Sequence, residues 1–191
     1  QAEPILVDGL ARLEYRGYDS AGVATTEGGK TSVRRAAGKL TSLRARLELE
    51  PCEGRTGIGH TRWATHGKPS ETNAHPHVSD GVTVVHNGII ENHRELRSEL
   101  QAQGRVFLSE TDTEIFAHLI ALERKAGRDL LHAVEAATKR VKGAYALAVL
   151  DEKTPGAIAF AKLASPLVVG YGEGENFLAS DVPAVLQHTR R

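Results

Sequence analysis

Residues 91–125 read ENHRELRSELQAQGRVFLSETDTEIFAHLIALERK. This stretch decides the fold class, because it predicts helices and so favours a mixed α and β fold over an all-β one. The apolar residues of its second half recur three and four positions apart, which is typical of a helix with a broad apolar face. These residues are Ile115, Phe116, Leu119, Ile120 and Leu122. The spacing predicts helices over 91–103 and 112–125, and a further helix over 130–141.

Strand-length segments lie on both sides of these helices. Near the start, Gly28-Gly29 separates two such segments, 23–25 and 31–35, which predicts a hairpin. Helices are also predicted over 4–15 and 40–49, and strands over 57–63, 82–86, 144–150, 157–162, 167–171 and 177–179. Hairpins at both ends with helices between them predict an α+β domain, in which antiparallel sheet packs against helices. We expect one domain over residues 1–191.

The bulk composition excludes several classes of protein. Lys plus Arg and Asp plus Glu number 24 each, so the formal net charge is zero. This balance gives no long-range attraction to nucleic acid or to an anionic membrane. No apolar run approaches the ~20 residues of a membrane-spanning helix. Cys52 is the only cysteine, so no internal disulfide can form, which favours a reducing compartment. We expect a cytoplasmic protein that binds neither nucleic acid nor a membrane.

Six of the nine histidines fall within residues 60–93, in a region that is mostly predicted loop. They are His60, His66, His75, His77, His86 and His93. One interpretation is a solvated polar loop with scattered histidines. Another is a metal site, because His75-Pro-His77 could supply two imidazoles. Carboxylates that would orient such ligands are sparse here, and Cys52 lies outside the cluster. We therefore expect no metal and no cofactor.

Three segments favour more specific chemistry. Glu14-Tyr-Arg-Gly-Tyr-Asp-Ser20 flanks a glycine with two tyrosines and an arginine, which ordinary aromatic packing would also explain. In Gly59-His-Thr-Arg-Trp-Ala-Thr-His-Gly67, Arg62 at a strand end could grip a carboxylate bidentately while Trp63 covers it; a structural salt bridge is the alternative. His86-Asn-Gly88 would end a strand with two neutral donors, as an oxyanion hole requires. Asn-Gly is more often only a turn.

Taken together, the motifs resemble one known family. The chain contains, in order, Tyr15-Arg-Gly-Tyr-Asp-Ser20, His60-Thr-Arg-Trp-Ala-Thr-His-Gly67, Asn73-Ala-His-Pro-His77, His86-Asn-Gly-Ile-Ile-Glu-Asn92 and Ser109-Glu-Thr-Asp-Thr-Glu114. Their wording, order and approximate spacing resemble the N-terminal glutaminase domain of the glutamine:fructose-6-phosphate aminotransferases, which are class II glutamine amidotransferases. The resemblance covers nearly the whole chain.

The resemblance implies an N-terminal-nucleophile hydrolase fold, a four-layer sandwich with two antiparallel sheets between helix layers. It also implies that L-glutamine is hydrolysed to glutamate and ammonia through a thioester on an N-terminal cysteine. The ammonia would be delivered to fructose 6-phosphate on sugar-isomerase domains of the same polypeptide, which gives glucosamine 6-phosphate. The full-length protein is expected to be a homo-oligomer.

The same resemblance implies roles for eight residues. Arg62 would hold the α-carboxylate of glutamine and Asp112 its α-ammonium. Trp63, Thr65 and His66 would close over the ligand. The Asn87 side chain and the Gly88 N–H would stabilise the oxyanion. Arg16 would lie near the nucleophile.

The chain departs from the family pattern at both ends. It starts at the beginning of a predicted helix, so we expect that the first strand, with the nucleophilic cysteine, is missing. The sugar-isomerase domains are absent from this chain as well. Cys52 follows Pro51 and belongs to no matching motif, so it is expected to be a buried or incidental thiol. The alternative to an active glutaminase is an inert glutamine-binding fragment that lacks the nucleophile.

Overall fold

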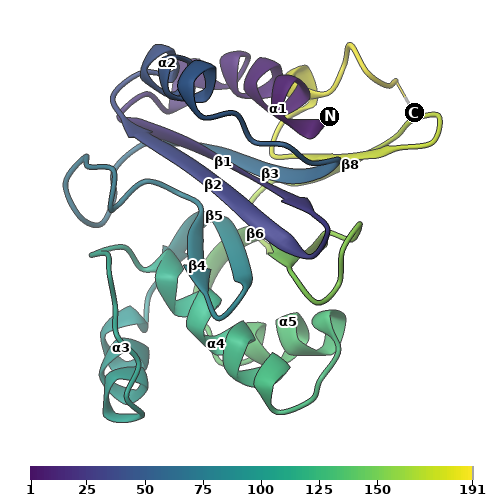
Figure 1. Ribbon diagram of the computed structural model, residues 1–191. Coiled ribbons are helices and arrows are strands. Elements are labelled where there is room, and N and C mark those ends of the chain that lie inside the picture. Colours follow the sequence, from purple (N-terminus) through teal and green to yellow (C-terminus); the bar gives the residue numbers. More distant parts are fainter. Residues whose placement is uncertain (191) are drawn as a thin grey trace.

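Two antiparallel sheets form the middle of the molecule (Figure 1). The structure is a computed structural model and describes residues 1–190. The first sheet has the order β2 (Lys30–Ala37), β1 (Ser20–Glu27), β3 (Thr56–Arg62). The second has the order β4 (His77–Ser79), β5 (Val82–Ile90), β6 (Gly143–Asp151), β7 (Ala159–Leu163). A separate hairpin pairs β8 (Val168–Tyr171) with β9 (Asn176–Ala179).

Helices cover the outer faces of these sheets. On one side α1 (Ala2–Ala11) and α2 (Leu40–Leu49) lie against the first sheet (Figure 1). On the other side lie α3 (His93–Ala102), α4 (Thr113–Lys125) and α5 (Leu130–Thr138). Short 3-10 turns lie at Glu14–Arg16, after α1, and at Val182–Ala184, after β9. The order helix, sheet, sheet, helix is the α+β sandwich that the sequence predicts.

Of the four apolar clusters in the described residues, three hold the layers together. The largest packs α3, α4 and α5 against one face of the second sheet, and its centre is α4, where Phe116 and Ile120 are fully buried. A second cluster joins α1 and α2 to the first sheet around Leu43. The third lies between the two sheets and includes Ile58, Val85 and Leu150. Because each sheet is covered on both faces, its strands carry apolar residues on both faces as well.

Most predicted elements are confirmed, and α2 matches to the residue, but two strands differ from prediction. The sequence ends the fourth predicted strand near His86, whereas β5 continues to Ile90. Asn87 pairs with Ala146 of β6, so the interpretation of Asn-Gly as a turn is wrong. Strand β4 was expected to be loop. Its polar residues are paired in the interior, where Ser79 Oγ lies 3.0 Å from His118 Nδ1, so polarity does not expose this segment.

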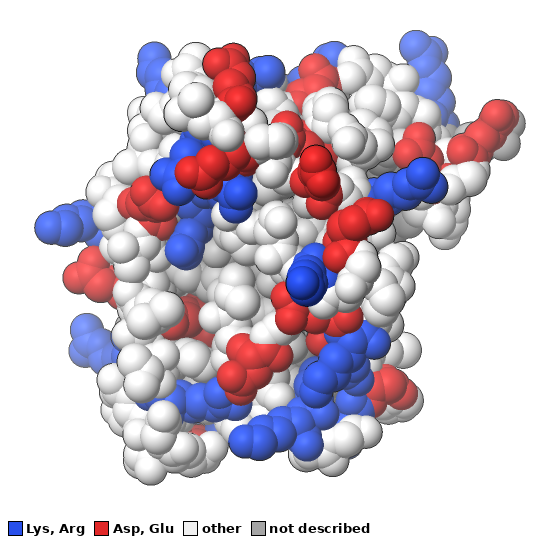
Figure 2. Space-filling view, viewed as in Figure 1, with Lys and Arg blue, Asp and Glu red and all other residues white. Residues whose placement is uncertain are grey.

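The surface carries both signs of charge. Figure 2 shows acidic and basic side chains interspersed over one face of the molecule. This mixing agrees with the equal totals of 24 acidic and 24 basic residues, and it gives no extended field of one sign on that face. Across residues 1–190, none of the helices combines the length and apolar character that crossing a bilayer requires.

Candidate functional site

All eight candidate residues line one cleft. It has a volume of about 1240 Å³ and lies among α1, β3, β5, β6 and the β8–β9 hairpin. The residues it brings together are Arg16, Arg62, Trp63, Thr65, His66, Asn87, Gly88 and Asp112. They come from four separate parts of the sequence, so the fold creates the site.

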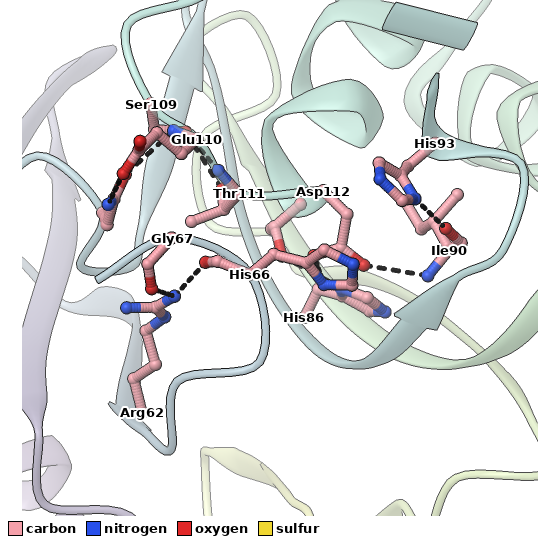
Figure 3. A network of polar contacts seen from close by, with 12 residues as sticks. Arg62, His66, Gly67, His86, Ile90, His93, Ser109, Glu110, Thr111 and Asp112 are labelled. Carbon is pink, nitrogen blue, oxygen red and sulfur yellow. Dashed lines mark hydrogen bonds and ion pairs between the residues drawn. The ribbon is translucent and has the colours of Figure 1, made fainter. Parts of the chain in front are cut away.

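Arg62 ends β3 and is only 4% exposed. Its Nη2 donates hydrogen bonds to the backbone oxygens of His66 and Gly67, the latter at 2.9 Å, and so holds the 63–67 loop (Figure 3). Its Nη1 has no hydrogen-bond partner in residues 1–190 and lies 3.8 Å from Asp19 Oδ1. Burial lowers the pKa of the guanidinium, and the charge of Asp19 opposes this shift. Arg62 therefore keeps one nitrogen without a hydrogen bond, and this nitrogen is balanced by the charge of Asp19.

Asp112 immediately precedes α4 and is 5% exposed. Its Oδ2 accepts a hydrogen bond of 2.8 Å from the Ile90 N–H (Figure 3). Its Oδ1 lies 3.9 Å from Nδ1 of His66, whose ring packs edge-on against His93 at 4.6 Å. Oδ1 accepts no hydrogen bond in the described part of the chain, and so it can interact with a cation in the cleft.

Glu114 fixes the loop that carries Asp112, and sequence reasoning missed this role. Its carboxylate accepts hydrogen bonds from the backbone N–H groups of Leu108 and Ser109, at 2.8 and 2.7 Å. Burial alone would raise the pKa of Glu114, but hydrogen bonding with His118, Ser109 and Leu108 lowers it to about 2. The motif Ser109-Glu-Thr-Asp-Thr-Glu114 contained the signal, because its last glutamate reaches back to its first serine.

Asn87 and Gly88 present two donors at the edge of β5. Ile90 donates away from β6, toward Asp112, and residues two apart on a strand direct their N–H groups to the same side. The Gly88 N–H therefore faces the Asp112 side as well. Gly88 has φ +132°, and a Cβ there would lie 2.0 Å from the Ala144 carbonyl oxygen, so only glycine fits. Asn87 Oδ1 lies 2.9 Å from Nε2 of His60 on the facing sheet.

The remaining candidates lie at the rim. Trp63 is 61% exposed and packs edge-on against Tyr18, with ring centroids 5.4 Å apart. Arg16 donates to Ser180 Oγ, so the Ala179-Ser-Asp181 segment also contributes to the cleft. Asp19 accepts from the Ala64 N–H near the start of the 63–67 loop. Thr65 lines the cleft beside them.

Four of the six histidines, His60, His75, His77 and His86, form a largely buried column rather than part of a solvated loop. His60 stacks on His75 with ring centroids 4.2 Å apart, and His75 meets His77 edge-on at 4.9 Å. Thr113 Oγ1 lies 2.7 Å from His75 Nε2 and 2.9 Å from His86 Nδ1. Across the described part of the chain, no group of three or more His, Cys, Asp or Glu side chains could hold a metal ion. Each of the rings of His60, His75, His77 and His86 uses one nitrogen in a hydrogen bond within the protein.

This column predicts acid sensitivity. Burial lowers the pKa of His60 to about 4 and that of His77 to about 3, below the unfolded value of 6.5. As the pH falls below 6.5 the unfolded chain therefore takes up protons first, so the stability contributed by the neutral rings is lost. Each ring should lower the free energy of unfolding by about 2 kcal/mol between pH 7.5 and pH 5.

Urea unfolding at the two pH values measures this difference. His60→Gln and His77→Gln serve as matched variants, since each should show a smaller loss than the unsubstituted chain. A free energy of unfolding that stays constant between pH 7.5 and pH 5 would contradict neutral, buried histidines.

Cys52 lies outside the cleft. It is 2% exposed, and its Sγ lies 3.8 Å from the Ser32 carbonyl oxygen. Burial raises the pKa of the thiol to about 11, so it is protonated at neutral pH. A protonated, inaccessible thiol is a poor nucleophile. The expectation of a buried thiol is confirmed.

Comparisons with known proteins agree with this geometry. Residues 60–187 match the family model described as a glutamine amidotransferase domain. The chain is 56% identical over 189 residues to the glutamine–fructose-6-phosphate aminotransferase (isomerizing) of Mesorhizobium japonicum, covering 99% of this chain and 31% of that protein. The corresponding Escherichia coli K12 protein is 56% identical over 189 residues, with 98% and 31% covered. The chain thus spans about a third of the length of the curated relatives it matches.

Solved structures confirm the fold. The glutamine phosphoribosylpyrophosphate amidotransferase of B. subtilis, complexed with ADP and GMP, superposes with a TM-score of 0.82 at 29% identity, over 97% of this chain and 40% of that one. A structure described as the allosteric regulatory enzyme of purine biosynthesis gives 0.83 at 30% identity, over 95% and 40%. The expected N-terminal-nucleophile type of sandwich is therefore confirmed.

Proposed function

Because the chain belongs to the glutamine amidotransferase family, we propose that it is the glutaminase part of a glutamine–fructose-6-phosphate aminotransferase. The observation that carries this proposal is the cleft itself. It brings a guanidinium nitrogen without a hydrogen-bond partner, a carboxylate oxygen and two neutral donors together. An amino acid with a side-chain amide has a matching set of groups.

Arg62 and Asp112 bind the head group of glutamine in this proposal. Glutamine carries one negative and one positive charge on its α-carbon substituents, so the site needs one group of each sign. Arg62 Nη1 takes the carboxylate, since Nη2 already holds the loop. Asp112 Oδ1 takes the ammonium, while Oδ2 remains on Ile90. A contact through one nitrogen thus replaces the expected bidentate grip.

Asn87 and Gly88 act on the reacting amide. A thiolate forms a bond to the side-chain carbonyl carbon, and the electron pair of the C=O bond moves to oxygen. The Asn87 amide and the Gly88 N–H donate to that oxygen as its negative charge develops. When the intermediate collapses, the C–N bond breaks and ammonia leaves with the proton taken from the thiol. Water then hydrolyses the thioester to glutamate and restores the thiol.

We place the nucleophile on an N-terminal cysteine of the full-length protein, with its α-amino group as the base. No cysteine lines the cleft in residues 1–190, and Cys52 is buried elsewhere. Ammonia would pass to fructose 6-phosphate on the sugar-isomerase domains of the same polypeptide, which in full length we propose to be a homo-oligomer. This chain, residues 1–191, is then one glutaminase domain.

Removing either head-group contact should weaken glutamine binding. Loss of a hydrogen bond to a charged partner costs about 1.5–3 kcal/mol, roughly 10- to 150-fold in Kd. Arg62→Ala removes the cation. Asp112→Asn retains an acceptor for Ile90 and removes only the charge. Calorimetry with L-glutamine measures Kd in full-length protein in which serine replaces the nucleophilic cysteine.

Asp151→Asn is the matched control. Asp151 is 3% exposed and pairs with Arg124 at 2.5 Å, but it does not line the cleft. Its substitution should leave the Kd for glutamine unchanged. If Arg62→Ala and Asp112→Asn also leave it unchanged, these residues are not the head-group site and the proposed function loses its main support.

A further inference from the structure

A side-chain amide is useful in an oxyanion site in only one of its two orientations. Its N–H end stabilises a negative oxygen, and its C=O end repels one. Asn87 is partly buried on β5, and its Oδ1 lies 2.9 Å from Nε2 of His60 on β3 of the facing sheet. With Oδ1 held between the sheets, Nδ2 is the end that remains for the cleft. The partner of Oδ1 therefore determines what the substrate meets.

His60 is suited to orient the Asn87 amide because the protonation state of its ring is fixed. The ring lies in the interior, where burial lowers its pKa to about 4, so it is neutral with a single N–H at neutral pH. Its Nδ1 is buried and has no hydrogen-bond partner in residues 1–190, whereas its Nε2 faces Asn87 Oδ1. A proton on Nε2 has Asn87 Oδ1 as its acceptor, whereas a proton on Nδ1 would have no acceptor within hydrogen-bond geometry among the described residues, although the His86 backbone also interacts with the ring. The proton therefore belongs on Nε2.

The ring is also fixed in position. It stacks on His75 with ring centroids 4.2 Å apart and planes at 25°. His75 Nε2 lies 2.7 Å from Thr113 Oγ1, and Thr113 follows Asp112 directly in the chain. The stack thus connects the amide on β5 to the start of α4, which carries the carboxylate of the head-group site.

We propose that His60 is a positioning residue, whose Nε2–H holds Asn87 Oδ1 and so turns the Asn87 Nδ2 donor toward the developing oxyanion. This role rests on the proposed glutaminase function. His60 acts through Asn87 and exchanges no proton with the substrate. Its loss should therefore lower kcat and leave KM nearly unchanged, because an oxyanion donor matters most in the transition state.

A double-mutant cycle in the full-length protein tests this role. His60→Leu should lower kcat for glutamate release roughly 10- to 100-fold, a part of the ~10²–10³ that loss of an oxyanion donor costs. In an Asn87→Ala background the same substitution should change kcat by less than about twofold, since no amide remains to be oriented. His60→Gln, whose own amide can donate to Asn87, should recover much of the lost kcat.

Asp151→Asn is again the control. Asp151 is also buried and paired, with Arg124, but it does not line the cleft. Its substitution shows what replacing an interior polar residue does to kcat by itself, and near-normal turnover is expected.

Each outcome decides the matter. Equal losses from His60→Leu in both backgrounds, or no loss in either, would overturn the positioning role while glutamine hydrolysis by the unsubstituted protein stands. No glutamate release from the unsubstituted protein would overturn the proposed function itself. If His60→Leu does not fold, ¹⁵N NMR of the unsubstituted chain decides: a proton on Nε2 of His60 supports the role, and a proton on Nδ1 overturns it.

Discussion

Asn87→Ala is expected to lower kcat for glutamine hydrolysis by ~10²–10³, about 2.7–4 kcal/mol, while KM changes much less. The amide is neutral, so its hydrogen bond strengthens only as negative charge builds on the substrate oxygen. Asn87 lies inside β5, opposite Ala146, and its side chain reaches the cleft rather than capping a turn. Steady-state kinetics on the full-length protein, with the melting temperature of the same preparation, give both quantities.

Asn92→Ala is the control for this variant. Asn92 also uses its amide twice, donating to the Arg140 carbonyl and accepting from the Lys142 N–H, but it does not line the cleft. Its loss should lower the melting temperature and leave kcat near normal. If Asn87→Ala behaves in the same way, with kcat within about twofold or ~0.4 kcal/mol of the unsubstituted enzyme, Asn87 has no oxyanion role.

Gly88→Ala should destabilise the whole fold. A Cβ at this position would lie 2.0 Å from the Ala144 oxygen and 2.8 Å from the Ala144 carbonyl carbon, both of which belong to the paired strand β6. The residue also has φ +132°, which alanine adopts only with strain. Overpacking and backbone strain cost about 1–3 kcal/mol each, so a loss of about 2–6 kcal/mol is expected. Urea unfolding measures it.

Gly104→Ala separates the two causes. Gly104 has φ +83°, but nothing lies within 4 Å of a Cβ built there. This variant should therefore show the backbone strain without the collision and lose clearly less stability. If Gly88→Ala is no more destabilising than Gly104→Ala, β5 and β6 do not pair closely at Gly88.

The layered fold could be predicted because its signals are local. Helix α4 repeats its apolar residues at helical spacing. Its buried residues from Ile115 to Ala121 are apolar except for His118, as packing between the sheet and the other helices requires. Strand β4 could not be predicted, because three residues give no period. Its polar side chains form hydrogen bonds with residues outside the strand; His77 Nε2, for example, lies 2.9 Å from Thr111 Oγ1. Sequence polarity alone cannot distinguish such pairing from exposure.

The candidate site, too, could be predicted from the sequence only in part. Motif wording identified the residues that face the cleft, including Arg62 and Asp112. It gave no indication of the distant partners of Asn87 and Arg16. His60 reaches Asn87 across 27 residues of sequence, and Arg16 reaches Ser180 across 164. Such pairs form only when two sheets and a C-terminal segment meet, so they follow from tertiary structure and from no local pattern.

Transfer of labelled nitrogen tests the central claim most directly. The full-length protein is incubated with L-glutamine carrying ¹⁵N in its side-chain amide and with fructose 6-phosphate. Glutamate and ¹⁵N-labelled glucosamine 6-phosphate should form in equal amounts, and alkylation of the N-terminal thiol should abolish both. A protein that binds glutamine but forms no glutamate would contradict the account and leave an inert glutamine-binding domain in its place.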